Sequence, residues 1–259
     1  MTFYCFLVSV NDATVTLAER IATTEDNFVS MMNEKAKELG LKNTNFKNAT
    51  GLDSENHYSS AYDMAMIAKE LVKHEKILEF TSIYEDYLRE DTDNSFWLVN
   101  TNRLVRFYQG VDGLKTGFTQ EAGYCLTATA KKDNMRLITV VMNEPDSNTR
   151  NNETSTMLDY GFNSYSIDSV FTKDSSLGKV KVELGNKKGV EVVPVKDTNI
   201  LNNKNNDKRV VDYKINLNNI KAPVKVGDKV GSIIISENNK KIMEVDLTVK
   251  ENISRRPSG

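Results

Sequence analysis

The sequence predicts an α+β protein in which helices pack on an antiparallel sheet, followed by a small all-β sandwich. Up to about residue 165, several segments carry apolar residues at helical spacing, and two neighbouring segments alternate as a hairpin does. Beyond that point only short alternating segments follow, separated by turn residues. We therefore expect a first domain over 1–165, a β-rich domain over 166–252 and a tail over 253–259.

Four helices are expected in the first domain. Each has an apolar face, and Gly40 is a stop signal for the second. Ser60, with Asp63 three residues later, has the spacing of a capping box. The expected ranges are 12–22, 25–39, a segment from Ser60 to about residue 72, and 149–162.

The strands follow from alternation. Leu126, Ala128 and Ala130 alternate with smaller or polar residues, 131–134 is turn-like, and 137–142 is rich in β-branched residues, which predicts a hairpin. An asparagine-rich segment at 199–207 is expected to be a solvated loop. Further strands are expected at 180–184, 190–195, 210–217, 230–235 and 242–249.

Composition excludes several classes of function. The 34 basic and 36 acidic residues give a net charge of -2, which argues against nucleic acid as a partner. Cys5 and Cys125 are too few for a disulfide scaffold or a four-cysteine zinc site, and His57 and His74 leave little for a histidine metal centre. We expect no metal or organic cofactor.

The ends of the chain carry no membrane signal. No apolar run approaches the roughly 18 residues that a spanning helix needs. Residues 1–10 are apolar but have no basic region before them, so we interpret them as part of a helix and not as a signal peptide.

Two short motifs have chemical potential. Lys115-Thr116-Gly117 precedes the hairpin, and an ammonium group, a hydroxyl and an open backbone together suit a carboxylate ligand; the alternative is a solvated strand edge. Ser9-Val10-Asn11 precedes the first helix, where serine can relay a proton and asparagine can bind an amide; the alternative is helix capping by Asn11 or Asp12.

Taken in chain order, Ser9-Val10-Asn11 and Lys115-Thr116-Gly117 resemble the S-x-N and K-T-G elements of penicillin-binding proteins. The surrounding stretches FVSMMNEKAKELGLKNTNFKNATGLDSENHYSSAYDMAMIAKEL and GVDGLKTGFTQEAGYCLTATA extend the likeness. Residues 1–165 resemble the low-molecular-weight penicillin-binding proteins, which are serine D-alanyl-D-alanine carboxypeptidases. The β-rich remainder is similar to that family's C-terminal domain.

The resemblance implies an acyl-enzyme mechanism on peptidoglycan stem peptides that end in D-Ala-D-Ala. It implies that Ser9 relays a proton and that Asn11 binds the substrate amide. It also implies that Lys115 and Thr116 hold the terminal carboxylate beside Gly117 and that the Phe118 backbone N–H is an oxyanion donor. Arg150 matches an arginine that helps to bind the terminal carboxylate; alternatively it is a surface residue in the first turn of its helix.

The nucleophile motif S-x-x-K is the missing part. Only eight residues precede Ser9, and the one S-x-x-K string, at 176–179, lies in the β-rich part and contains Gly178. We therefore predict that the chain is inactive alone and binds β-lactams only with a complementing N-terminal fragment. We also predict that residues 1–165 expose apolar surface where the absent helix would pack.

Two other residues are interpreted as structural. His57 is expected to order a loop, and Cys125 to be a buried strand residue.

Two alternatives to an enzyme part remain. One is a non-catalytic module that binds D-Ala-D-Ala through Lys115, Thr116 and Arg150. The other is a structural role for the β-rich domain. The family resemblance implies an extracytoplasmic, membrane-associated location, although the chain shows neither an export signal nor an anchor.

Overall fold

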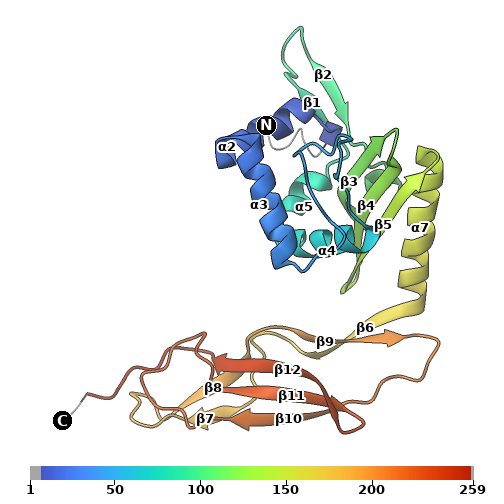
Figure 1. Cartoon of the computed structure of the whole chain (residues 1–259). Coiled ribbons are helices and arrows are strands. Elements are labelled where there is room, and N and C mark those ends of the chain that lie inside the picture. The colour runs from blue at the N-terminus through green and yellow to red at the C-terminus, as the bar shows by residue number, and fades with distance from the viewer. Residues whose placement is uncertain (1–6, 258–259) are drawn as a thin grey trace. The chain divides into compact units, whose positions relative to one another are not determined.

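The computed structural model describes residues 7–257, and the chain folds as two compact units, Met1–Asn163 and Ser164–Gly259 (Figure 1). The expectation that residues 1–10 form part of a helix falls mostly outside the described residues. Leu7 and Val8 are helical.

A three-stranded antiparallel sheet forms the centre of the first unit, in the order β3-β4-β5. The central strand is β4, whose residues 126–130 are all buried, because helices cover both faces of the sheet. The predicted hairpin is confirmed as β4 and β5. The bounds are Val111–Thr119 for β3, Gly123–Lys132 for β4 and Met135–Glu144 for β5.

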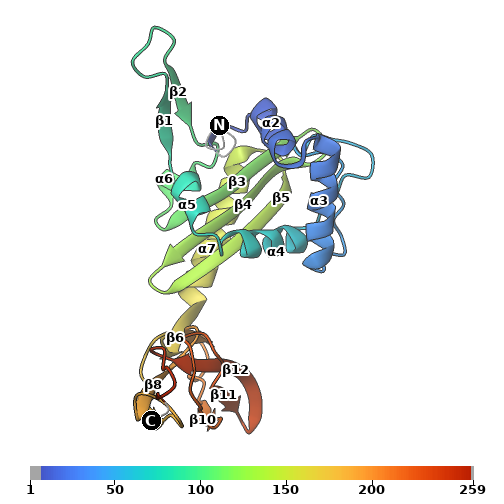
Figure 2. The same cartoon turned by 90° about the vertical axis from the view of Figure 1, so that its left-hand side faces the viewer.

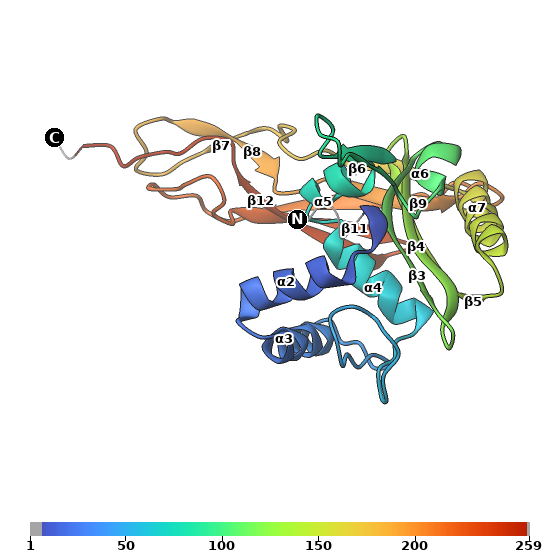
Figure 3. The ribbon, with the colours of Figure 1, turned by 90° about the horizontal axis from the view of Figure 1, so that it is seen from above.

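Helices α4 and α5 lie on one face of this sheet and α7 on the other (Figures 1 and 3). Gly161 of α7 packs directly on β5: a Cβ there would lie 2.4 Å from Leu137 Cδ1. All four expected helices are confirmed, and Ser60 accepts a hydrogen bond from Asp63 N as its spacing predicts. The helices are α2 (Asn11–Ala22), α3 (Glu25–Glu38), α4 (Ala61–Leu71), α5 (Lys76–Thr81), α6 (Leu104–Phe107) and α7 (Ser147–Ser164).

A second hairpin was not expected from the sequence. It consists of β1 (Glu85–Leu88) and β2 (Phe96–Val99) and extends away from the sheet (Figure 2). Tyr87 pairs with Trp97, whose indole N–H donates to Glu85 Oε2 at 2.9 Å.

The second unit is all β, as predicted. Its five-stranded sheet has the order β10-β11-β12-β8-β7, and β6 pairs with β9 in a second sheet. The two sheets share one core, in which Ile200 of β9 packs with Val192, Ile233 and Leu247. The strands are β6 (Tyr165–Phe171), β7 (Lys179–Lys181), β8 (Gly189–Pro194), β9 (Thr198–Asn203), β10 (Asp212–Leu217), β11 (Gly231–Glu237) and β12 (Lys240–Val249).

Two expectations about this unit are wrong. The asparagine-rich segment 199–207 is not wholly a loop, because its first half belongs to β9 and buries Ile200 and Asn202. Residues 253–259 are not simply a tail, because Ile253 is 1% exposed and pairs with Val224. In each segment an isoleucine, Ile200 or Ile253, supplies burial that composition alone does not suggest.

Candidate active site

Lys115 and Ser9 are in direct contact. Lys115 lies in the middle of β3, and its ammonium group donates hydrogen bonds to Ser9 Oγ and to Thr116 O, the latter at 3.0 Å. Ser9 precedes α2 with a backbone φ of 55°, a left-handed conformation that is uncommon for serine and often occurs at functional sites. A hydroxyl beside an ammonium group can pass a proton, so this contact has the chemistry that a relay serine requires.

Thr116 is held by a residue that the sequence did not single out. Its Oγ1 lies 2.7 Å from Thr101 Oγ1. Thr101 in turn lies between Asn100 and Asn102, which are 1% and 0% exposed. Asn102 donates to Gly113 O of β3 at 3.1 Å, so the Asn-Thr-Asn segment is fastened to the strand that carries Lys115. The only feature of the sequence that could have indicated the role of this segment is its run of three short polar residues.

Asn11 is the first residue of α2, two positions after Ser9, and its side chain is exposed. The capping alternative is wrong for this helix, because Val10 occupies the cap position and no side chain caps it.

The end of β3 is open on one side. Nothing lies within 4 Å of the position that a Cβ on Gly117 would take. Phe118 is 51% exposed, and its ring centroid lies 4.3 Å from that of Tyr124 on β4. A ligand can thus approach the backbone of this strand closely.

Arg150 is buried, so the surface-residue alternative is wrong. Its side chain is in the first turn of α7, donates to Asn151 Oδ1 and lies 6.0 Å from the centre of the Tyr124 ring. Burial lowers the pKa of the guanidinium from its usual value, which nearby Cys125 and Tyr124 partly offset. Arg150 is linked to the end of β3 by aromatic contacts: its guanidinium lies near the Tyr124 ring, and Tyr124 packs against Phe118 of β3. Ser9 and Lys115, by contrast, are joined by a direct hydrogen bond.

An apolar hollow of about 220 Å³ lies beside β3, between α4 and the sheet. Its lining combines apolar side chains with the Lys-Thr-Gly segment, and Met142 remains 37% exposed. Members of the lining from α4 are Met64, Ile67, Ala68 and Leu71.

The sequence drew attention to two further places, the Ser176–Lys179 string and His57. Ser176 lies in a loop and Lys179 begins β7, so the two do not share a helical face. His57 Nδ1 accepts a hydrogen bond from Lys47 N at 2.8 Å, and burial lowers the imidazole pKa despite the opposing effect of Asp53. This contact supports the interpretation of His57 as a loop-ordering residue.

Cys125 is only half-buried and lies 3.4 Å from Ala122 O, which corrects the expectation of a buried residue. The physical reason is a bulge in β4 between Tyr124 and Leu126.

Within residues 7–257 no three His, Cys, Asp or Glu side chains gather as a metal site would require. No helix in the same range has the length and apolar character for crossing a bilayer.

Comparison with known proteins identifies both parts of the chain. The D-alanyl-D-alanine carboxypeptidase family profile matches residues 1–146, and the profile of the penicillin-binding protein 5 C-terminal domain matches residues 165–255. D-alanyl-D-alanine carboxypeptidase DacF of Bacillus subtilis is 48% identical over 250 residues, which are 96% of this chain and 64% of that protein. DacA of Escherichia coli is 33% identical over 249 residues, which cover 95% of this chain and 61% of that relative.

Solved structures give the same result. Penicillin-binding protein 5 of Haemophilus influenzae superimposes with a TM-score of 0.71 at 32% identity, covering 98% of this chain and 73% of that one. The coverages of 64% and 61% given above mean that the chain spans somewhat less than two thirds of the length of the first curated relatives. On its sequence, its fold and the Lys-Thr-Gly strand beside Ser9, the chain belongs to the D-alanyl-D-alanine carboxypeptidase family of low-molecular-weight penicillin-binding proteins.

Proposed function

We propose that this chain supplies the substrate-binding and proton-relay part of a serine D-alanyl-D-alanine carboxypeptidase. Its substrate is a peptidoglycan stem peptide that ends in D-Ala-D-Ala. The enzyme acts on this peptide outside the cytoplasmic membrane, and membrane association would keep it near the cell wall. The observation that carries the proposal is the hydrogen bond from Lys115, in the middle of β3, to Ser9, in a chain of this family.

In this proposal the terminal carboxylate of the peptide binds Lys115 and Thr116, with Arg150 adding positive charge at the end of β3. Asn11 receives the substrate amide. The backbone N–H of Phe118 donates to the oxygen that becomes negative when the carbonyl is attacked. Ser9 passes a proton to the amine of the departing D-alanine, and Lys115 holds the Ser9 hydroxyl in place.

The attacking serine and its lysine partner are not among the residues that this site brings together. We propose that a helix bearing S-x-x-K, supplied from outside these 259 residues, completes the site and forms the acyl-enzyme. The apolar hollow between α4 and the sheet is next to the Lys-Thr-Gly segment and supports this placement. β-lactams would then acylate the completed enzyme and not this chain alone.

Acylation tests the proposal directly. The chain is incubated with benzylpenicillin, either by itself or together with the part of the Bacillus subtilis relative that it does not match, and intact masses are measured. We expect no adduct on this chain and, in the mixture, an adduct on the added fragment together with release of D-alanine from a D-Ala-D-Ala peptide. A stoichiometric adduct on this chain by itself contradicts the proposal.

A variant pair tests the relay. In the reconstituted mixture, Ser9→Ala is expected to slow D-alanine release by about 10²- to 10⁴-fold, the usual contribution of a positioned acid–base group. Ser30→Ala, at an exposed position on α3, is the matched control and should leave the rate unchanged. Equal rates for the two variants would remove Ser9 from the mechanism.

The second candidate function is a module that binds D-Ala-D-Ala without cleaving it. The assembled contact of Ser9, Lys115 and Thr116 favours it, because these groups are already in place without a nucleophile. Calorimetry with a diacetyl-Lys-D-Ala-D-Ala peptide should show weak, saturable binding that Lys115→Ala abolishes and Lys69→Ala, an exposed lysine on α4, preserves. A folded sample that binds no peptide excludes this candidate.

A further inference from the structure

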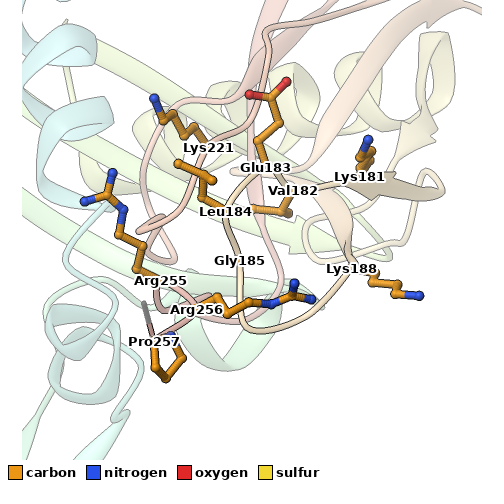
Figure 4. A pocket seen from close by; sticks show the side chains of 10 residues that line it. All are labelled: Lys181, Val182, Glu183, Leu184, Gly185, Lys188, Lys221, Arg255, Arg256 and Pro257. Atoms are coloured by element: carbon orange, nitrogen blue, oxygen red, sulfur yellow. The ribbon is translucent and has the colours of Figure 1, made fainter. Parts of the chain in front are cut away.

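The second unit contains a basic hollow that has no part in the chemistry proposed above. It has a volume of about 1110 Å³ and lies around the turn at Gly185, between β7, the Lys221 segment and the last described residues (Figure 4). One carboxylate, Glu183, lines it together with five cations. These five, the hollow cations, are Lys181, Lys188, Lys221, Arg255 and Arg256.

The hollow cations are not neutralised by the protein. Among the described residues none of the five forms an ion pair, and all five side chains are exposed. Their neighbours differ: Lys187 pairs with Glu251 at 2.5 Å and Lys250 pairs with Glu191 at 3.1 Å. A chain with a net charge of -2 therefore concentrates uncompensated positive charge in one place.

The arrangement of the hollow cations does not suit a single small anion. The hollow cations fan out from the turn in different directions instead of converging on one point (Figure 4). Gly185 is packed closely at the base, since a Cβ there would lie 2.9 Å from Ile253 Cγ2. A ligand that meets several of these cations at once must carry negative charges spaced along its length.

Apolar surface lies between the charges. Val182 is buried at the base, but Leu184 is 52% exposed in the middle of the basic surface, with a φ of 55°. Pro257 adds a further apolar group to the lining. A partner with carbon linkers between its anionic groups would contact both kinds of surface.

We propose that the hollow binds a soluble polymer of phosphodiester-linked alcohols. Guanidinium groups such as those of Arg255 and Arg256 bind phosphate with two hydrogen bonds, lysines supply point charges, and the linkers cover Leu184. The proposal is independent of the carboxypeptidase site, because every residue in it belongs to the second unit.

The test is a titration of the full chain with a fluorescent glycerol-phosphate oligomer, followed by fluorescence polarisation. The triple variant Lys188→Gln/Arg255→Gln/Arg256→Gln is expected to bind on the order of a hundredfold more weakly. Each cation that faces an anionic phosphate surface contributes about fivefold in affinity, and the three contributions multiply. Binding to the wild type should weaken as salt is raised, and less steeply so in the variant.

The matched control removes the same charge elsewhere in the second unit. Lys173→Gln/Lys196→Gln/Lys214→Gln alters three exposed lysines outside the hollow and should bind within about twofold of the wild type, since only nonspecific attraction is lost. Equal weakening of the two triple variants overturns the proposal by showing that the attraction is not local.

A single substitution tests the apolar contact. Leu184→Asn keeps the charge and suits the positive φ, and it should weaken oligomer binding severalfold because the linkers lose an apolar partner. Inorganic phosphate should compete only weakly.

A third arm uses phosphatidylcholine vesicles with and without phosphatidylglycerol. Binding to the anionic vesicles but not to the oligomer overturns the proposal in favour of a lipid surface. Absence of binding to any of these probes by folded protein also overturns it.

Discussion

Replacing Asn102 with alanine should destabilise the first unit by removing a buried polar link between the Asn-Thr-Asn segment and β3. The side chain of Asn102 is 0% exposed, donates to Gly113 O at 3.1 Å and accepts from Leu104 N at 3.2 Å. Truncation leaves two buried backbone groups without these partners. At about 1–3 kcal/mol for each such group, we expect a loss of roughly 2–6 kcal/mol.

Urea unfolding followed by the helical circular dichroism signal measures this loss. The signal reports on the first unit, because the helices among the described residues end by Ser164. Asn94→Ala, at an exposed position between β1 and β2, is the control and should change the unfolding free energy by less than about 0.5 kcal/mol. A change below about 1 kcal/mol for Asn102→Ala would refute the idea that this hydrogen-bonded segment stabilises the site strand.

Three further predictions concern other parts of the chain. Ile253→Ala should destabilise the second unit by about 2–5 kcal/mol, measured by urea unfolding followed at a strand signal, because the side chain is 1% exposed; a change near zero would show that this segment does not belong to the core. His57→Gln should flatten the loss of stability below about pH 6.5: burial lowers the folded-state pKa, so the unfolded chain takes up the proton first and the stabilisation present above that pH is lost as the pH falls. An unchanged pH profile would contradict this. Gly231→Ala should lower the melting temperature markedly, since the new Cβ would lie 2.2 Å from Asn216 O on β10, and a wild-type melting temperature would refute that packing.

The sequence predicted those elements whose local pattern agrees with their final burial. The helix from Glu25 to Glu38 and the hairpin of β4 and β5 are of this kind, because periodicity and capping or turn residues point to the same structure. The hairpin of β1 and β2 escaped prediction because its aromatic residues remain exposed and give no inward face to detect. Strand β9 was missed because asparagine composition outweighed the alternation of Thr198, Ile200 and Asn202.

The residues of the candidate site also fall into those that the sequence predicted and those that only the structure revealed. Ser9 and Lys115 were found from short motifs, although they lie 106 residues apart and only the fold brings them into contact. Thr101 was not found, because its importance comes from a neighbour across the fold, Thr116, and not from its own sequence context. The burial of Arg150 was equally invisible, since a charged residue in the first turn of a helix is usually exposed.

The position of Trp97 gives the molecule a built-in optical reporter. It is the single tryptophan of the chain, 61% exposed and hydrogen-bonded to Glu85. All indole emission therefore originates on the hairpin of β1 and β2, and β2 runs directly into the segment whose Thr101 meets Thr116. A ligand that displaces this segment should alter the emission of an unlabelled protein, whereas an event in the second unit should leave it unchanged.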